Sequence, residues 1–437
     1  MRPHEFISAL NQASATKYVG RVVKISQSHL ESEGPLSSVG DICLIGNVQD
    51  RKMALVTAVD REKTVLMPFN SIQNISANEK VTLIDGQRYA KVGEALLGRL
   101  IDAMGNPLDD RGDMLTTEKW NLLGKILSPA ERSVSEIAVR TGIRAIDGIM
   151  PIAEGQRLGI FAAAGVGKTS LIEQLATQSE FDNYVICLVG ERGREVRALW
   201  DQISSQENRD KYCGFAATSD KSPIMRIRAV YQALSQAEYL RSKGRKVLFL
   251  LDSITRFAMA LRELGLVSGE PPTQRAYTPN VFSALPKIVE RCGARQEGGS
   301  ITAFMTVLSE TDDVDDPIVE IMKSLLDGHI ILSRKLAEKS HFPAIDVLKS
   351  VSRQSERIMD AKQKNIVKDV ISDMSIYEDA RIMIESGIYK SGNSKEIDRA
   401  ISNNPKILHF LKQSSDSFEA FENTMAKLQS LGGSSHA

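Results

Sequence analysis

The sequence predicts an α/β fold, in which a small β-barrel precedes a mostly parallel α/β domain and a helical region follows it. Three observations predict this order. Short strand-like runs fill residues 18–90, long apolar runs alternate with helix-length segments from 157 to about 350, and few strand signals occur from about 355 to 425. We therefore expect a barrel domain at 1–90, an α/β domain with a leading connector at 91–355 and a helical domain at 356–437.

The N-terminal region has the pattern of a small β-barrel. Its strand-like runs are separated by Gly, Asn, Asp and Pro, and they read YVGRVVKIS, GDICLI, KMALVTAVD, KTVLMPF and VTLIDGQRYAKV. Short strands at this spacing are typical of barrels. Residues 93–155 then form a connector, which is marked by the turn dipeptides of DAMGNPLDDRGD.

The middle of the chain has the pattern of a buried, mostly parallel sheet. Its apolar runs are LGIFAAA, YVICLVG, KVLFLLD, SITAFMTVL and HIILS, with helix-length segments between them. Continuous apolar runs indicate strands that are covered on both faces. Beyond residue 355 the segments ERIMDAKQKNIVKDVISDM, SIYEDARIMIESGIYKSG and PKILHFLKQ predict helices.

Composition and charge argue against several classes of protein. The chain has 55 Lys and Arg against 55 Asp and Glu, whereas a protein that mainly grips nucleic acid usually carries a basic excess. The four cysteines show no Cys-x-x-Cys spacing and are expected to be thiols in a reducing cytosol. No apolar run reaches the length of a signal peptide or a membrane span, so we expect any membrane association to be peripheral.

Residues 162–170, AAAGVGKTS, nearly match the phosphate-binding loop G-x-x-x-x-G-K-[ST], but alanine stands at its first glycine position. The apolar RLGIF before the loop predicts a strand. The segment KTSLIEQLATQ after it places Leu171, Ile172, Leu175 and Ala176 on one helical face. This context favours a nucleotide site over a chance match in a glycine-bearing turn.

The predicted loop carries the chemistry that a triphosphate needs. Gly165 and Gly167 leave the backbone free to aim its N–H groups at phosphate oxygens. Lys168 would bridge the β- and γ-phosphates, and Thr169 would offer its hydroxyl to Mg²⁺. Ala162 stands where strand becomes loop, and its methyl group is tolerated there if φ is negative. The nucleotide-binding residues expected from this loop are Ala164, Gly165, Val166, Gly167, Lys168, Thr169 and Ser170.

Acidic residues follow two of the buried strands. Asp252 ends KVLFLLD and could hold Mg²⁺ through water, as a Walker-B aspartate does. It could also cap the helix that follows, and the two roles are compatible. Glu191 comes after YVICLVG at the ligand-binding edge of the sheet, where it could polarise a water for attack on the γ-phosphate. Glu195 is a local competitor for that role, and spacing alone does not choose between the two.

A larger set of motifs then points to a known family. They are GEALLGRLIDAMGNPLD, TGIRAIDGIMPIAEGQRLGIFAAAGVGKTSL, VGERGREV, LLDSITRFAMALRELGL, GEPPTQRAYTPNVFSALPKIVERCG and LLDGHIILSRKLAEKSHFPAIDVLKSVSR. From about residue 18 to 415 the chain resembles the ATPases of type III protein secretion, relatives of the rotary ATPase catalytic subunits. The resemblance implies a RecA-like P-loop core, with ATP and Mg²⁺ as ligands. Alanine is frequent at the first loop position in this family, and the AAAG form is more similar to injectisome members than to flagellar ones.

The resemblance also implies roles for single residues. Lys168 and Thr169 match the loop lysine and the Mg²⁺-ligating threonine, and Asp252 matches the Walker-B aspartate. Glu191 matches the catalytic glutamate of the GER motif, and this match selects Glu191 over Glu195. Arg192, next to it, matches an arginine that helps to organise the phosphate site.

Two further residues are implied by resemblance near the end of the α/β domain. Phe342, in HFPAID, matches an aromatic residue that packs on adenine; the other interpretation is a core phenylalanine. Arg353, in SVSR, matches an arginine finger that reaches the nucleotide of the neighbouring subunit; the other interpretation is a structural ion pair. A finger in trans implies a ring as the active form, because a monomer would have incomplete sites, and the resemblance implies that this ring is a homohexamer.

For function, the resemblance implies an ATP-driven motor of protein export, which strips chaperones from secreted proteins and unfolds them. The segment 1–17 would meet a stator-like regulator, a coiled-coil central stalk would enter the ring, and chaperone–substrate complexes would touch the helical domain. The chain would be cytoplasmic, held peripherally through the export apparatus at the inner face of the bacterial inner membrane, and would bind no nucleic acid.

Other functions remain as alternatives. A flagellar export ATPase is one, and a rotary ATP synthase subunit is a more remote one, although DDVDDPIVEIMKSLLDGHIILSR resembles the secretion branch. An RNA-driven hexameric translocase would need base-stacking aromatics in its first domain, but residues 1–100 contain only Phe6, Tyr18, Phe69 and Tyr89. The last alternative is a scaffold that binds nucleotide without hydrolysing it, and the ATPase activity of a Glu191→Gln variant tests this alternative.

Overall fold

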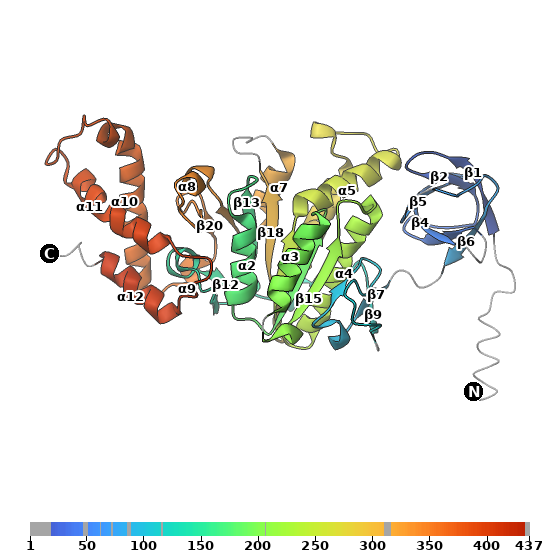
Figure 1. Ribbon diagram of the computed structural model, residues 1–437, viewed down its shortest axis with the longest axis horizontal. Coiled ribbons are helices and arrows are strands. Elements are labelled where there is room, and N and C mark those ends of the chain that lie inside the picture. Colours follow the sequence, from blue (N-terminus) through green and yellow to red (C-terminus); the bar gives the residue numbers. More distant parts are fainter. Residues whose placement is uncertain are drawn as a thin grey trace.

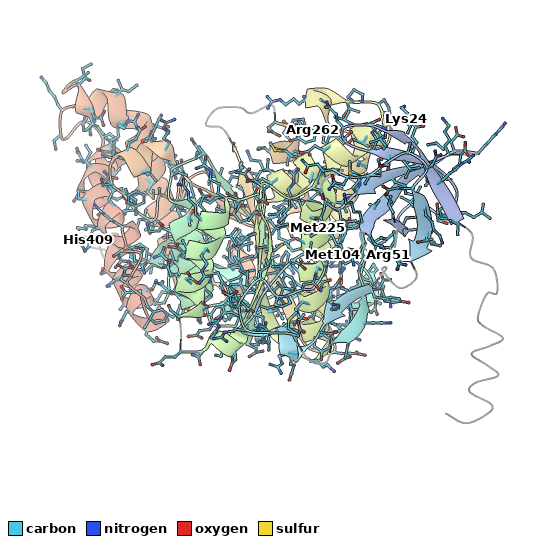
Figure 2. All side chains as sticks on the ribbon, turned by 45° about the vertical axis from the view of Figure 1, so that its right-hand side comes forward. Lys24, Arg51, Met104, Met225, Arg262 and His409 are labelled. Atoms are coloured by element: carbon cyan, nitrogen blue, oxygen red, sulfur yellow. The ribbon has the colours of Figure 1, made fainter. Side chains whose placement is uncertain are left out.

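The structure, a computed structural model, describes residues 19–46, 51–61, 63–70, 73–84, 89–114, 117–205, 207–309 and 316–432. Within these ranges the chain forms three units in a row, a barrel, a central α/β unit and a set of C-terminal helices (Figure 1). In Figure 2, Lys24 on the barrel and His409 among the C-terminal helices mark opposite ends of the molecule. The predicted fold class is confirmed. The segment 1–17, where a regulator contact is expected, lies outside the described residues.

The barrel closes from short strands in the order β1-β2-β5-β4-β3-β6. Their bounds are β1 Val19–Ile25, β2 Leu30–Glu33, β3 Ile42–Ile45, β4 Lys52–Val59, β5 Thr64–Pro68 and β6 Lys80–Ile84. Its core includes Val22, Leu30, Val56 and Leu66, all fully buried. The sequence did not predict β2, because LESE has a single apolar residue and buries its serine instead.

One predicted strand divides into two. The run 81–92 contains the end of β6 and a separate strand, β7 (Tyr89–Val92). β7 pairs with β9 (Glu118–Asn121) of the connector and takes no part in the barrel. The dipeptide Asp85-Gly86 inside the run is a turn signal in the sequence and could have indicated this break.

A ten-stranded sheet forms the middle of the central unit. Its main path is β20-β19-β13-β18-β16-β14-β15-β8, and every pairing along this path is parallel except that of β19 with β20. Strand bounds are β8 Leu100–Ile101, β13 Arg157–Ala162, β14 Asn183–Val189, β15 Tyr212–Ala217, β16 Lys246–Asp252, β18 Ser300–Leu308, β19 Gly328–Ile331 and β20 Val351–Ser352. The short strands β10 Arg132–Ser133 and β17 Gly293–Arg295 join its side, and β11 Ala138–Val139 pairs with β12 Ile152–Ala153.

Helices cover both faces of this sheet. One core contains α4 (Pro223–Ser242), α5 (Ile254–Val267), α6 (Pro279–Glu290) and α7 (Pro317–Leu325), together with strand residues such as Val185 and Phe249. The other contains α2 (Lys168–Gln178) and α3 (Gly193–Ser204), together with the next strand residues along, Ile186 and Leu250. Strand side chains are thus buried in alternation on both faces, which explains the continuous apolar runs of the sequence.

A buried ion pair ties the connector to the central unit. Arg291 Nε lies 2.6 Å from Glu238 Oε1, and the two side chains are 1% and 3% exposed. Trp120 of β9 donates its indole N–H to Glu238 (3.1 Å), and Arg291 also donates to the carbonyl of Leu122 (3.1 Å). Because a buried charge is costly without partners, this network fixes β9 against α4 and the end of α6.

The C-terminal helices are α9 Ser355–Ile358, α10 Ala361–Glu385, α11 Lys395–Leu411 and α12 Phe421–Gly432. The helical segments predicted at 356–374 and 375–392 are mostly one helix, α10, because no glycine or proline interrupts it. Gln363 of α10 donates to the carbonyl of Gly148 (3.0 Å), and Arg144 pairs with Glu419 (3.2 Å), so the helices are attached to the central unit. No helix in the described part of the chain combines the length and the apolar character needed to cross a membrane.

Candidate nucleotide site

The predicted phosphate-binding loop lies between β13 and α2. Ala162 is the last residue of β13, so its backbone is extended and tolerates the methyl group. The residue is 1% exposed. Gly167 has a φ of 92°, a left-handed conformation that glycine adopts without strain, and α2 begins at the next residue, Lys168. The apolar face predicted for this helix is buried. The loop therefore brings a helix N-terminus and a lysine to the same point.

Two carboxylates converge on Lys168 at the carboxyl edge of the sheet. β16 ends at Asp252, and β14 ends two residues before Glu191. Lys168 Nζ lies 2.6 Å from Asp252 Oδ1 and 3.8 Å from Glu191 Oε1. Parallel strands end at the same edge of a sheet, which is why residues so distant in sequence meet here.

Asp252 has a second partner, which comes from β18. The Thr306 hydroxyl donates to the same Oδ1 that accepts from Lys168, at 2.6 Å, and Thr306 is 1% exposed. The helix that follows, α5, is capped by Ser253, whose hydroxyl accepts from the backbone N–H of Arg256. The interpretation of Asp252 as a helix cap is therefore wrong, and its carboxylate faces the lysine.

Glu191, and not Glu195, belongs to this group. Glu191 Oε1 accepts a hydrogen bond from Arg256 Nε (3.1 Å), whereas Glu195 is exposed on α3. Burial raises the pKa of Glu191, and the negative charge of Asp252 adds to the rise, while Lys168 and Arg256 oppose it. A partly buried carboxylate with a raised pKa, next to a lysine and an arginine, is suited to accept a proton.

Arg192 and Gly190 flank this glutamate. Arg192 is 69% exposed and its guanidinium pairs with Glu195 at 3.7 Å, so its side chain is not gathered with Lys168 and Asp252. Gly190 has a φ of 72°, and a methyl group there would lie 2.6 Å from Cδ of Arg256. Glycine at this position therefore leaves the space through which Arg256 reaches the glutamate.

A cavity of about 420 Å³ opens beside Gly167. Phe342 lines it and is 41% exposed, so this residue is not a core phenylalanine. The segment 412–415, which follows α11, forms another wall, and the backbone N–H of Gln413 donates to the carbonyl of Phe342 (2.8 Å). An exposed aromatic ring in a cavity beside a phosphate loop offers a stacking surface for a nucleobase.

Arg353 lies apart from the residues around Lys168. It follows β20, it is exposed, and its backbone N–H donates to the carbonyl of Asp327 (3.0 Å). Its guanidinium reaches the carbonyl of Lys323 at 3.5 Å. Within the described ranges Arg353 forms no ion pair with a carboxylate. The interpretation of Arg353 as part of a structural ion pair therefore finds no support among these residues.

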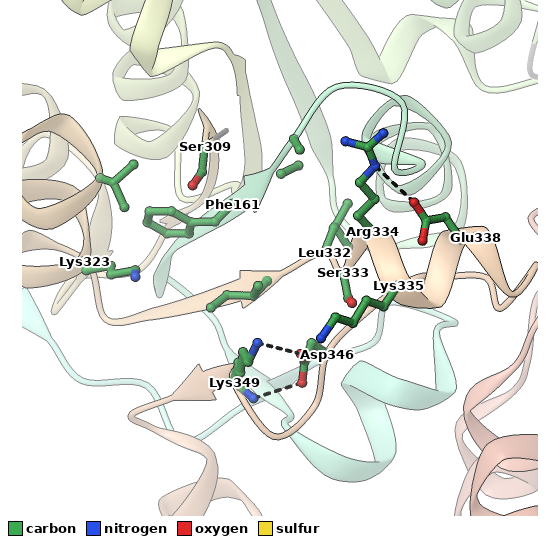
Figure 3. A pocket seen from close by; sticks show the side chains of 14 residues that line it. Phe161, Ser309, Lys323, Leu332, Ser333, Arg334, Lys335, Glu338, Asp346 and Lys349 are labelled. Atoms are coloured by element: carbon green, nitrogen blue, oxygen red, sulfur yellow. Dashed lines mark hydrogen bonds and ion pairs between the residues drawn. The ribbon is translucent and has the colours of Figure 1, made fainter. Parts of the chain in front are cut away.

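A second cavity, of about 430 Å³, is lined from α7 and from α8 (Arg334–Glu338) and is shown in Figure 3. Its lining carries more basic than acidic side chains: Lys323 lies beside Phe161, and Lys335 and Lys349 lie around Asp346. It shares only the start of the loop, residues 162–163, with the predicted site. The cavity beside Gly167 therefore fits a nucleotide better, because it adjoins the loop glycine that precedes the lysine.

Most of the remaining loop residues are exposed to solvent. Ala164, Gly165, Thr169 and Ser170 are exposed, and Val166 is buried beneath them. In the described part of the chain, no group of three or more His, Cys, Asp or Glu side chains could hold a metal ion by itself. A hydroxyl and one carboxylate do fit Mg²⁺, which usually takes few protein ligands and completes its shell with waters and substrate phosphates.

Several contributors were missed from the sequence. Arg256 lies one helical turn beyond Asp252, and that spacing could have indicated it. Thr306, Gln174 and the segment 412–415 carry no such signal, because each meets the site only through the packing of distant segments.

Comparison with known proteins relates the whole chain to one group. Residues 142–352 match the model of the ATP synthase alpha/beta family, nucleotide-binding domain, and residues 359–430 match that of the T3SS EscN ATPase C-terminal domain. The flagellum-specific ATP synthase of Bacillus subtilis is 40% identical, over 99% of either chain. The type 3 secretion system ATPase of Xanthomonas euvesicatoria is 39% identical, over 97% of either chain.

Solved structures agree with this relation. The assembled ATPase EscN from the enteropathogenic E. coli type III secretion system matches with a TM-score of 0.90 at 34% identity, covering 94% of this chain and 99% of EscN. The structure of assembled EscN in complex with its central stalk EscO matches with a TM-score of 0.87, again at 34% identity and with the same coverage.

Proposed function

The chain belongs to the family of type 3 secretion system ATPases and flagellum-specific ATP synthases and is an ATPase, and we propose that it uses ATP hydrolysis to drive protein export. The single observation that carries the catalytic part is the convergence of Asp252 and Glu191 on Lys168. The exposed ring of Phe342 supports a base site on the other side of the loop.

We place the triphosphate over the loop between β13 and α2. The backbone N–H groups of 164–170 and the N-terminus of α2 attract phosphate oxygens. On binding, Lys168 exchanges its contact with Asp252 for the β- and γ-phosphates. Asp252, which accepts a hydrogen bond from Thr306, would hold Mg²⁺ through water, and Thr169 would offer its hydroxyl to the ion. Bound Mg²⁺ supplies charge neutralisation at the phosphates.

Glu191 is the proposed base in hydrolysis. A water forms a bond to the γ-phosphorus while the bond from that phosphorus to the bridging oxygen of ADP breaks. The proton of the water passes to Glu191. Arg256 orients the glutamate through its 3.1 Å hydrogen bond. Lys168 stabilises the charge that develops on the phosphoryl oxygens. Arg192 is exposed in this structure, and it would join the phosphate site only after its side chain turns away from Glu195.

Arg353 supports a ring as the active form. Its exposed guanidinium has no carboxylate partner in the described residues and lies apart from the lysine of its own chain, as a finger acting on a neighbour requires. Such a finger in trans is worth about 10³–10⁵ in rate. We therefore propose a homohexamer, and EscN has been solved in an assembled state.

The remaining partners follow from family membership. EscN forms a complex with its central stalk EscO, and we propose an equivalent coiled-coil stalk here. We propose that a stator-like regulator binds the segment 1–17, that chaperone–substrate complexes contact the C-terminal helices, and that no nucleic acid is bound. The chain would work in the cytoplasm, attached peripherally to the export apparatus.

The test is ATP turnover per chain as a function of protein concentration, for wild type, Lys168→Ala, Glu191→Gln and Arg353→Ala. We expect specific activity to rise with concentration, all three variants to be inactive, and Arg353→Ala to keep its nucleotide affinity. Flat activity down to monomeric concentrations, with a harmless Arg353→Ala, would contradict the ring. Unchanged turnover in Glu191→Gln would contradict the assigned base.

Injectisome and flagellar export need a separate experiment. The AAAG loop favours an injectisome, and relatives of both kinds are similar to this chain. When the chain is expressed in a strain that lacks its injectisome ATPase, secretion should be restored. When it is expressed in a strain that lacks its flagellar ATPase, the cells should remain non-motile. Restored motility alone would assign the chain to the flagellum.

A further inference from the structure

We propose that Gln156 is a positioning residue for catalysis, which holds Arg353 where it can reach the nucleotide of the neighbouring subunit. This inference rests on the proposed function, because it takes Arg353 as a finger that acts in trans, and it names the group that places this finger. Gln156 directly precedes β13 and is 0% exposed. Arg353 follows β20 and is exposed, so the fold brings together two residues from distant segments.

The strand before Arg353 has little support of its own. In the described part of the sheet, β20 consists of two residues, lies at the end of the strand order and pairs only with β19. Among the described residues, the Arg353 guanidinium makes one hydrogen bond, the long one to the carbonyl of Lys323 (3.5 Å). The direction of this side chain is therefore set by the backbone at 352–353, and the groups that hold this backbone position the finger.

The amide nitrogen of Gln156 reaches the two groups that fix this backbone. Its Nε2 donates to the hydroxyl of Ser352 (3.1 Å) and to the carbonyl of Asp327 (3.2 Å). The same carbonyl accepts the backbone N–H of Arg353 (3.0 Å). One side chain thus contacts both the residue before the finger and the acceptor that holds the N–H of the finger itself.

The turn at 151–156 fixes the other end of the amide. Gln156 Oε1 accepts from the backbone N–H of Ala153 (2.9 Å), and the Ser352 hydroxyl donates to the carbonyl of Pro151 (2.9 Å). Ser352 is 7% exposed, so water has little access to these bonds. Because a buried polar group without its partner is costly, the amide has one favourable arrangement, and this arrangement determines where Ser352 lies.

Asp327, the other contact of the amide, is held firmly. Its carboxylate accepts two hydrogen bonds from the Arg157 guanidinium, from Nε to Oδ2 at 2.8 Å and from Nη2 to Oδ1 at 2.9 Å. Arg157 also pairs with Glu290 at 2.7 Å. A bidentate pair between arginine and carboxylate fixes direction as well as distance. Gln156 therefore links the end of β20 to a rigid part of the sheet.

The expected loss of activity is smaller than the loss on removing the finger. Gln156→Met keeps the approximate length and volume of the side chain but has no hydrogen-bond donor, so the 352–353 backbone loses its link to the turn. A displacement of about 1 Å costs about 10²-fold in rate, and a whole finger is worth about 10³–10⁵. We expect kcat to fall by about 10–100-fold. KM and the affinity for ADP should not change, because the phosphate loop follows the opposite end of β13.

The decisive experiment mixes two variants of the full chain in one ring. Lys168→Ala lacks the loop lysine but keeps a well-placed Arg353, whereas Gln156→Met keeps its own loop and has a displaced finger. The two are mixed at low concentration, concentrated together and assayed by phosphate release. About a quarter of the interfaces in a random equal mixture combine an intact loop with a well-placed finger. We expect activity per chain at least about threefold above the mean of the separate variants.

A reference pair separates failure of this inference from failure of the proposed function. Lys168→Ala mixed with Arg353→Ala should also regain activity, because each variant supplies what the other lacks. Restoration in the reference pair alone would overturn the positioning role, since Gln156 would then act within its own chain. Restoration in neither pair would count against the trans finger of the proposed function, and the positioning role would fall with it.

Further variants separate positioning from general damage to the fold. Ser352→Ala removes only the hydroxyl that Gln156 holds, and kcat should fall by about 2–10-fold, with the same restoration on mixing. Gln236→Met is the matched control, because Gln236 on α4 is also 0% exposed and its amide bonds to the backbone N–H and carbonyl of Gly93, both at 2.9 Å. It should lose thermal stability and keep kcat within about twofold of wild type. Equal kcat losses in Gln236→Met and Gln156→Met, or an unchanged kcat in a folded Gln156→Met, would refute the assignment.

Discussion

Replacing Thr306 with valine tests how Asp252, the proposed Walker-B aspartate, is held. The two side chains have the same shape, so the change removes the hydroxyl that donates to Asp252 Oδ1 at 2.6 Å and leaves the packing of β18 intact. A hydrogen bond to a charged group contributes about 1.5–3 kcal/mol. If the loss falls on the transition state, kcat decreases by about 10–150-fold, since each 1.36 kcal/mol is tenfold.

Steady-state ATPase assays at saturating nucleotide measure this effect, and nucleotide binding is measured separately. We expect the affinity for ADP to change little, because the loop and Phe342 provide most of the binding contacts in the proposed site. Thr306→Ser should restore most of kcat, since it keeps the hydroxyl. Thr302→Val is the matched control on the same strand, where the hydroxyl accepts from the N–H of Gly155 away from the site (2.8 Å). A kcat of Thr306→Val within twofold of wild type would refute the reasoning.

Three further predictions concern charge, stability and backbone. Arg256→Gln removes a group that lowers the pKa of Glu191, so that pKa rises and the acidic limb of the kcat–pH profile moves to higher pH; an unmoved limb contradicts this. Arg291→Met leaves Glu238 buried and unpaired, and urea unfolding should show a loss of about 3–5 kcal/mol. Gly190→Ala strains a positive φ and displaces Arg256, so thermal unfolding should report a loss of about 1–3 kcal/mol, with lower ATPase activity.

The fold around the proposed phosphate end could be predicted from sequence because its geometry is local. A strand, a glycine turn and a helix N-terminus follow one another within 157–178, and the structure shows them in that order. Asp252 and Glu191 were found because they follow buried strands, and parallel strands end at one edge. The competing interpretation of Asp252 failed because the next residue, Ser253, is the cap.

The base end could not be predicted in the same way. Its wall at 412–415 meets α2 through contacts between residues about 240 positions apart, such as Gln174 with Ser414. Periodicity and turn signals describe neighbours in sequence and contain nothing about such packing. For the same reason β2, with one apolar residue, and the separation of β7 from the barrel were missed.

The wall at 412–415 has a consequence for how the chain responds to force. It connects α11 to the segment that leads into α12, so it moves with the C-terminal helices, yet it closes the cavity beside Phe342. A binding partner that pulls on those helices therefore also pulls on the nucleotide cavity. Since coupling between two sites is reciprocal, a partner bound at the helices changes the affinity for ADP by the same free energy with which ADP changes the affinity for that partner.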